Sequence, residues 1–147
     1  MRTVKNYING NSTAISTQTI DINDPSTGEK IGEVIMSSKE DFENAVQNLK
    51  KAQIEWSQTT PLKRSRILSR FKNLIEDNID ELASIVSKEH GKTFADAKGS
   101  VTRGLEVVEF ACGIPHLLKG EFSQNVGTNI DSWSVRQPLG ICAGITP

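Results

Sequence analysis

The stretch RQPLGICAGITP, Arg136 to Pro147, decides the expected fold class of this 147-residue chain. Its apolar run Ile141–Ile145 is framed by Gly140 and by a Thr-Pro pair. A short apolar run bounded in this way is typical of a buried parallel strand. With the order of the other elements, the run predicts either an α+β protein or the first portion of an α/β protein. Because a parallel strand needs neighbours reached through crossover connections, the chain is expected to be cut inside a sheet.

Upstream, the first 36 residues predict three short strands. The first, Lys5–Ile8, is closed by the turn pair Asn9-Gly10, which tolerates positive φ. Two further extended runs, Thr19–Ile22 and Ile31–Ile35, flank a loop that contains Pro and Gly. The N-terminal part of the chain is therefore expected to begin with small β-structures.

After residue 36 the hydrophobic period changes from 2 to 3.6, which predicts helices. Ser37 with Glu40 is expected to form a capping box for the first helix. Its apolar face comprises Phe42, Ala45, Val46, Leu49, Ala52 and Trp56.

Three further helices are predicted from their capping signals. Thr60 is expected to cap the second helix, and Asn78 with Glu81 to cap the third, which ends at Gly91. The fourth runs from Phe94 to about Cys112, with Thr93 and Asp96 at its start.

Beyond Pro115, two strands are predicted, Glu121–Val126 and Asp131–Arg136. They surround a turn at Gly127-Thr128-Asn129. The order of elements is thus strands, helices, a hairpin and one buried strand.

Composition narrows the classes of partner. Seventeen basic and 18 acidic residues give a net charge of −1, which argues against a general nucleic-acid or anionic-membrane binder. No apolar run approaches the roughly 18 residues of a membrane span, and the N-terminus lacks the apolar region of a signal peptide. A cytoplasmic location and small-molecule or protein partners are expected.

No complete active site is visible from the residues alone. The chain has no phosphate-binding glycine loop and no familiar metal or nucleophile motif. Cys112 and Cys142 are interpreted as buried free thiols, and His90 as an imidazole at a helix end. A metal site is not predicted.

Arg103 is the most informative charged residue. It lies two positions from both Val101 and Leu105, about 200° around the helix, so it points away from the apolar stripe. One interpretation is an exposed arginine paired with Glu106. The other is a guanidinium that holds a substrate carboxylate in a bidentate pair.

Several segments together resemble the N-terminal part of the aldehyde dehydrogenase superfamily. They are YING, NDPSTGEKIGEV, the connection from Trp56 to Arg66, KEHGKTFADAKGSV and PLGICAGITP, in the family's order. Within the superfamily, GSVTRGLEVVEFACGIPHLLKGE is most similar to the CoA-acylating methylmalonate-semialdehyde dehydrogenase branch.

The resemblance implies a Rossmann-like NAD-binding domain and a protruding hairpin for oligomerisation. Residues 1–120 would supply the first strands and helices of that domain, 121–137 the hairpin, and 138–147 the truncated first core strand. As a domain, the chain would be incomplete.

The implied reaction is the NAD-dependent oxidation of malonate or methylmalonate semialdehyde. A cysteine attacks the aldehyde, hydride passes to NAD, and the acyl group is transferred to coenzyme A with loss of carbon dioxide. Another aldehyde dehydrogenase, such as a succinate-semialdehyde type, and a non-catalytic interaction module are the alternatives.

By position, Arg103 matches the arginine that contacts the substrate carboxylate in this branch. Ile145, Thr146 and Pro147 match the segment that lines the nicotinamide cofactor, and Glu121 to Arg136 matches the hairpin that joins subunits into dimers or tetramers. No catalytic residue is assigned to the chain.

The family's nucleophilic cysteine, general base and oxyanion-hole asparagine have no counterpart in these residues, so the chain alone is expected to be inactive. Its helix faces and the residues Ile141 and Ile145 are expected to remain exposed, which predicts self-association.

Overall fold

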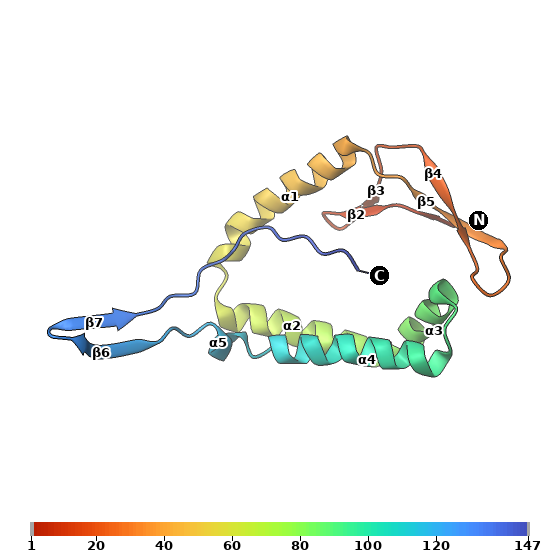
Figure 1. The fold of residues 1–147 in the computed structure, drawn as a ribbon. Coiled ribbons are helices and arrows are strands. Elements are labelled where there is room, and N and C mark those ends of the chain that lie inside the picture. The colour runs from red at the N-terminus through yellow and green to blue at the C-terminus, as the bar shows by residue number, and fades with distance from the viewer. Residues whose placement is uncertain (1, 147) are drawn as a thin grey trace.

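The computed structural model describes residues 2–146, which form short strands, then helices, then a hairpin and an extended C-terminal segment (Figure 1). This order confirms the predicted α/β class. The strands are β1 (Arg2–Val4), β2 (Asn6–Ile8), β3 (Asn11–Thr13), β4 (Thr19–Asn23), β5 (Lys30–Ile35), β6 (Phe122–Gly127) and β7 (Ile130–Trp133). The helices are α1 (Lys39–Gln58), α2 (Pro61–Asp77), α3 (Ile79–His90), α4 (Phe94–Ala111) and α5 (Ile114–Leu117).

The N-terminal strands form two small sheets. In the first, β5 lies between β1, to which it is parallel, and β4, to which it is antiparallel. In the second, β2 and β3 pair across a turn at Asn9 and Gly10, whose φ values are 52° and 76°. The predicted hairpin start is confirmed, because this tight turn needs two residues that tolerate positive φ.

Helix α1 begins one residue later than predicted. Ser38, not Ser37, is its N-cap: the Ser38 hydroxyl accepts from the Asp41 N–H, and the Asp41 carboxylate accepts from the Ser38 N–H. Both serines have an acidic residue three positions on, so local spacing fits either. Asp41 decides between them, because it also binds a distant loop that Glu40 does not reach.

The cap of α3 also differs from the prediction. The Asn78 side chain makes no capping bond to α3 and instead donates to the Leu74 carbonyl at the end of α2. Asn78 is the residue at which α2 ends and α3 begins, and its side-chain amide caps the C-terminal end of α2. The Thr60 and Thr93 caps and the left-handed end at Gly91 are confirmed.

Gly91 also provides a test of the packing between the end of α3 and the loop that joins β4 to β5. Its φ is 74°, and a Cβ there would lie 2.8 Å from the Pro25 Cγ. Gly91→Ala should therefore lower the free energy of unfolding by about 1–3 kcal/mol. Gly99→Ala is the control, because a Cβ at this helical position meets nothing within 4 Å and should stabilise α4 by about 0.5–1 kcal/mol. Equal effects in urea denaturation would contradict this account.

The hairpin of β6 and β7 protrudes from the body (Figure 1). Its strands begin and end within two or three residues of the predicted bounds, and the Asn129 φ of 60° confirms the turn. Phe122 and Trp133 face each other in its register and remain largely exposed.

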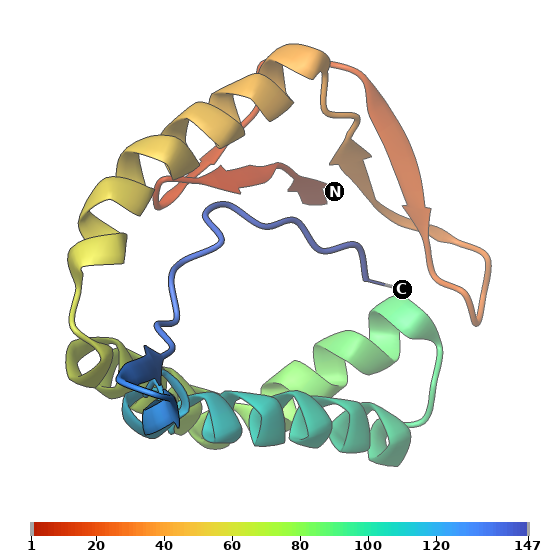
Figure 2. The ribbon, with the colours of Figure 1, turned by 60° about the vertical axis from the view of Figure 1, so that its left-hand side comes forward.

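The predicted parallel strand Ile141–Ile145 is not formed. The segment 135–146 carries no strand, and among residues 2–146 no backbone hydrogen bond joins it to another element. A strand requires a neighbour, and none of the described strands lies alongside this one. Figure 2 shows it running through the opening of a ring made by the two N-terminal sheets and α1 to α4.

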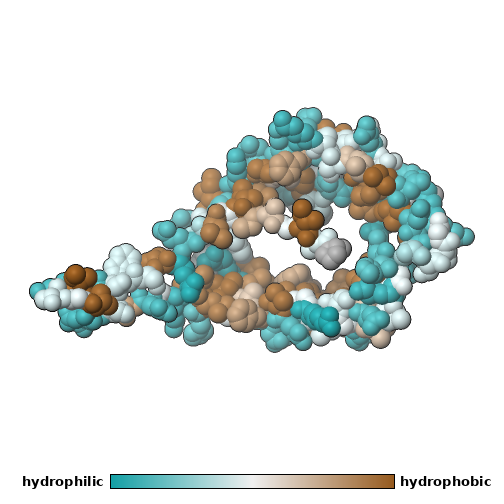
Figure 3. Space-filling model, viewed as in Figure 1, coloured by the Kyte–Doolittle hydropathy of each residue, from teal (hydrophilic) through white to brown (hydrophobic). Residues whose placement is uncertain are grey.

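The ring exposes an unusual amount of apolar surface. The accessible surface is 11472 Å², whereas a compact protein of 16.1 kDa has about 7,400 Å². Ala83 and Ala97 are the buried hydrophobic residues of the described part, while Phe42, Leu49 and Trp56 of α1 are about half exposed or more. Figure 3 shows apolar side chains around the central opening. The predicted helix faces therefore exist, and their expected exposure is confirmed.

Candidate functional site

Helix α4 holds the predicted substrate-binding residue, Arg103, on its exposed side. The predicted orientation away from the stripe of Val101 and Leu105 is confirmed, since these two are partly buried. The expected ion pair with Glu106 is not among the ion pairs of the described residues. Arg103 thus carries an exposed guanidinium that suits a carboxylate.

Two polar contacts join α4 to the neighbouring helices α2 and α3. The Lys98 Nζ lies 2.6 Å from the Asp80 Oδ1 of α3, and the Ser65 hydroxyl of α2 donates to the Cys112 carbonyl at 2.6 Å. Lys72 of α2 lies 2.7 Å from Glu76, and this hydrogen bond is the main cause of its raised pKa. The Ser65 hydrogen bond and the Lys98–Asp80 ion pair therefore link α4 to α2 and α3, whereas the Lys72–Glu76 pair lies within α2.

The predicted cofactor-contacting residues lie on the C-terminal segment. Ile145 is fully exposed, Thr146 is also exposed, and Pro147 is outside the described residues. A Cβ added at the neighbouring Gly144 would meet nothing within 4 Å. The described residues therefore leave this end of the segment open. No hydrogen bond joins this segment to Arg103 within the described chain.

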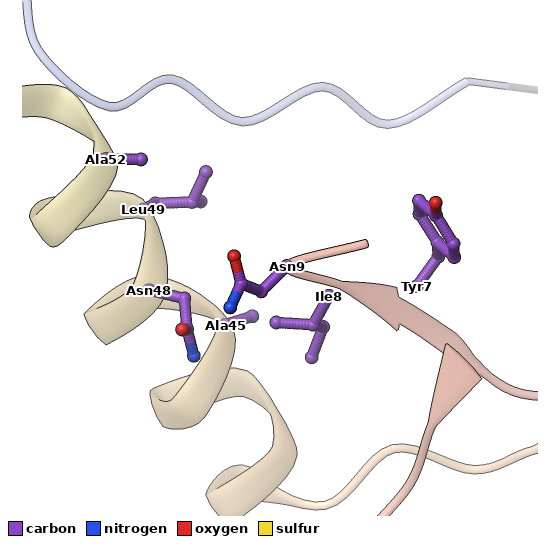
Figure 4. Close-up of a pocket in the computed structure, with 7 residues that line it drawn as sticks. All are labelled: Tyr7, Ile8, Asn9, Ala45, Asn48, Leu49 and Ala52. Atoms are coloured by element: carbon purple, nitrogen blue, oxygen red, sulfur yellow. The ribbon is translucent and has the colours of Figure 1, made fainter. Parts of the chain in front are cut away.

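A pocket of about 210 Å³ lies between the β2–β3 hairpin and α1, beside the C-terminal segment (Figure 4). Its polar groups are the amides of Asn9 and Asn48 and the hydroxyl of Tyr7. Its apolar lining consists of Ile8, Ala45, Leu49 and Ala52. It contains no carboxylate, histidine or thiol, so it provides packing space and hydrogen bonds, not catalytic groups.

Asp41 is an important residue that the sequence analysis missed. Its side chain is 3% exposed and lies at the start of α1. Its Oδ1 accepts from the Ile15 N–H at 2.7 Å, and its Oδ2 accepts from the Ser16 N–H at 3.1 Å and the Ser38 N–H at 2.9 Å. One carboxylate therefore joins the loop after β3 to the first turn of α1. The spacing of Ser38 and Asp41 could have indicated a cap, but not the distant contacts.

These contacts favour the charged form of Asp41. The N–H of Ile15, followed by that of Ser38, holds the pKa of the Asp41 carboxyl well below its usual range, and burial opposes this without overcoming it. Backbone donors around a carboxylate stabilise its anion in this way. Asp41 is therefore a structural anion and not a proton-transfer group.

The cysteines and histidines form no metal centre within residues 2–146, where no three His, Cys, Asp or Glu side chains gather suitably. Cys112 is half-buried, and its Sγ contacts the Val108 carbonyl. Cys142 is exposed, so the prediction that it is buried is wrong: the strand expected to enclose it lacks a sheet. No helix of the described residues is long and apolar enough to cross a membrane.

Known proteins are similar to the chain along its whole length. The chain is 45% identical over all 147 residues to malonate-semialdehyde dehydrogenase of Pseudomonas aeruginosa, covering 30% of that protein. It is 42% identical over 146 residues to the mouse mitochondrial acylating methylmalonate-semialdehyde/malonate-semialdehyde dehydrogenase, covering 99% of this chain and 27% of that protein.

A solved structure has the same fold over the entire chain. It is named as a methylmalonate-semialdehyde dehydrogenase from Sinorhizobium meliloti in complex with NAD. The TM-score is 0.94 and the identity 47%, with 100% of this chain and 30% of that chain covered. This chain therefore spans about 30% of the length of the relatives it matches. The pattern of the aldehyde dehydrogenase family matches residues 12–147, and the chain belongs to that family.

Proposed function

We propose that this chain is the N-terminal portion of an NAD-dependent, CoA-acylating methylmalonate- or malonate-semialdehyde dehydrogenase. The observation that carries the proposal is the 45% identity to the Pseudomonas aeruginosa enzyme across the whole chain. The word acylating in the name of the mouse relative supports coenzyme A as the acyl acceptor. The complex of the Sinorhizobium meliloti relative supports NAD as the oxidant.

In the proposed reaction, malonate semialdehyde, NAD and coenzyme A give acetyl-CoA, carbon dioxide and NADH; the methylmalonate analogue gives propionyl-CoA. NAD supplies the hydride acceptor when it is bound. The chain's own contribution is to bind and orient. Arg103 would hold the substrate carboxylate, and Ile145, Thr146 and Pro147 would contact the nicotinamide part of NAD.

The open ring is consistent with a role as part of a larger enzyme. In relatives more than three times as long, further polypeptide is available to cover the apolar faces around the central opening. The chain alone lacks a catalytic nucleophile and should be inactive. A cytoplasmic location of the enzyme is part of this proposal.

Oligomerisation is proposed to involve residues Glu121 to Arg136. The protruding hairpin supports this role, because Phe122, Val126, Ile130 and Trp133 expose 58 to 71% of their surface. Exposed apolar side chains on a two-stranded ribbon favour pairing with another subunit.

A chimera tests the proposed substrate class. Residues 1–147 would replace the matching segment of the Pseudomonas aeruginosa relative, and the purified chimera would be assayed for NADH formation. We expect turnover of malonate and methylmalonate semialdehydes, with succinate semialdehyde a poor substrate. A preference for succinate semialdehyde would favour the other subfamily. A folded chimera with no aldehyde oxidation would favour a non-catalytic interaction module.

A further inference from the structure

Helix α4 contains a glycine, Gly99, that the conformation of the helix does not require. Its φ is not positive, and a Cβ added there would meet nothing within 4 Å among the described residues. Glycine in the interior of a helix lowers the stability of the helix relative to alanine, because the unfolded backbone is more flexible. What the missing side chain provides is free space beside this turn of α4.

This space lies next to the substrate-binding candidate Arg103. Residues four positions apart in a helix are about 40° apart around the axis and about 6 Å apart along it, so Gly99 and Arg103 share one face. The Cα–Cβ bonds of a helix tilt toward its N-terminus, and a long side chain covers the turn before its own Cα. The Arg103 side chain therefore extends over the turn that contains Gly99. This relation is set by the helix itself.

The polar groups beside this turn favour an anion. The Lys92 Nζ donates to the Ser100 hydroxyl at 3.1 Å, and neither Lys92 nor Arg103 takes part in an ion pair of the described residues. The acidic residue of the preceding turn, Asp96, accepts a hydrogen bond from the Thr93 hydroxyl at 2.8 Å. Two cationic side chains thus lie near this turn, and the Asp96 carboxylate is hydrogen-bonded at the start of the helix.

We propose, on the basis of the proposed role of Arg103, that the substrate carboxylate lies over Gly99 and that Gly99 is a specificity-determining residue for aldehydes that carry a carboxylate. A carboxylate that binds a guanidinium through both oxygens needs room in the plane of the guanidinium. A β-carbon at position 99 would take up part of this room. Closely packed sites tolerate even one additional methyl group poorly.

Gly99→Ala in the chimera tests this role. We expect kcat/KM for malonate semialdehyde to fall about tenfold, the effect of one methyl group in a closely packed site. The change should be mainly a higher KM, because Arg103 holds the carboxylate before the reaction as well as during it. Oxidation of propanal, which has no carboxylate, should change little. The urea midpoint should rise, because alanine favours the helix, so unfolding would not explain the loss.

Gly104→Ala is the matched control. Gly104 is also an interior glycine of α4 with nothing within 4 Å of an added Cβ, but it lies about 100° around the helix from Arg103. This variant should keep the kcat/KM of both substrates.

A double variant tests the link between the two residues. In Gly99→Ala/Arg103→Ala, kcat/KM for malonate semialdehyde should equal that of Arg103→Ala alone. Without the guanidinium, no carboxylate is held over position 99, so the added methyl group has nothing to displace.

The proposal is overturned, and the proposed function left standing, if Gly99→Ala keeps its kinetics while Arg103→Ala selectively loses activity toward malonate semialdehyde. Equal losses for malonate semialdehyde and propanal in Gly99→Ala also overturn it, as do independent effects in the double variant, because Gly99 would then pack against other polypeptide. If Arg103→Ala has no selective effect, the carboxylate-binding role of Arg103 is wrong, and that of Gly99 with it.

Discussion

Arg103→Ala in the chimera should lower kcat/KM for malonate semialdehyde by about 10- to 100-fold. Loss of hydrogen bonds between a guanidinium and a carboxylate costs about 1.5–3 kcal/mol, and each 1.4 kcal/mol corresponds to a factor of ten. Arg103 is exposed and outside the ion pairs of the described chain, so the substitution leaves no internal charge unpaired. Steady-state kinetics with malonate semialdehyde measures the effect.

Two controls separate substrate recognition from structural damage. Propanal has no carboxylate, so its oxidation should change little in Arg103→Ala. Arg70→Ala removes another exposed arginine, on α2, and should leave both substrates unaffected. Equal losses for malonate semialdehyde and propanal would contradict a carboxylate-binding role for Arg103.

Asp41→Asn should produce the largest loss of stability. The substitution removes the charge that accepts the N–H groups of Ile15, Ser16 and Ser38, and it introduces an amide donor beside them. We expect the melting temperature to fall by more than about 5 °C. Asp80→Asn is the matched control, because Asp80 is exposed and holds only a surface ion pair, which contributes little. Similar melting temperatures for the two variants would contradict the proposed role of Asp41.

The dependence of stability on pH follows from the same carboxylate. Because folding lowers the pKa of Asp41, its contribution is fully present above the ordinary aspartate pKa and is lost as the pH falls toward the depressed value. Asp41→Asn should therefore flatten the acid limb of the stability curve below about pH 4. Urea midpoints between neutral and acidic pH measure this change. An unchanged acid limb would mean that other carboxylates dominate.

The sequence predicted those elements that depend on local signals. The Asn9-Gly10 turn, the Thr60 and Thr93 caps and the end of α3 at Gly91 each rest on the conformational preference of one or two residues. The face of α4 that carries Arg103 follows from the helical period alone. These predictions are confirmed, because the conformational preference of one or two residues is enough to determine each feature without contacts from distant elements.

Non-local contacts explain the errors. Ser37 and Ser38 have equivalent local patterns, and only the reach of Asp41 to Ile15 selects the second. The apolar run Ile141–Ile145 has the composition of a buried strand, yet no strand is formed there, because a strand forms only beside a neighbour. Cys142 is exposed for the same reason. The carboxylate-binding role of Arg103 was one of two interpretations of an exposed arginine, and the family resemblance favoured it. The cofactor role of Ile145, Thr146 and Pro147 rests on the resemblance, and both roles stay predictions.

The most direct test of the central proposal is the identity of the product that the chimera forms. With malonate semialdehyde, NAD and coenzyme A, mass spectrometry should detect acetyl-CoA in equal amount to NADH, because residues 1–147 would then support the acylating reaction of the relative they replace. Formation of NADH with free malonate and no acetyl-CoA would contradict the account.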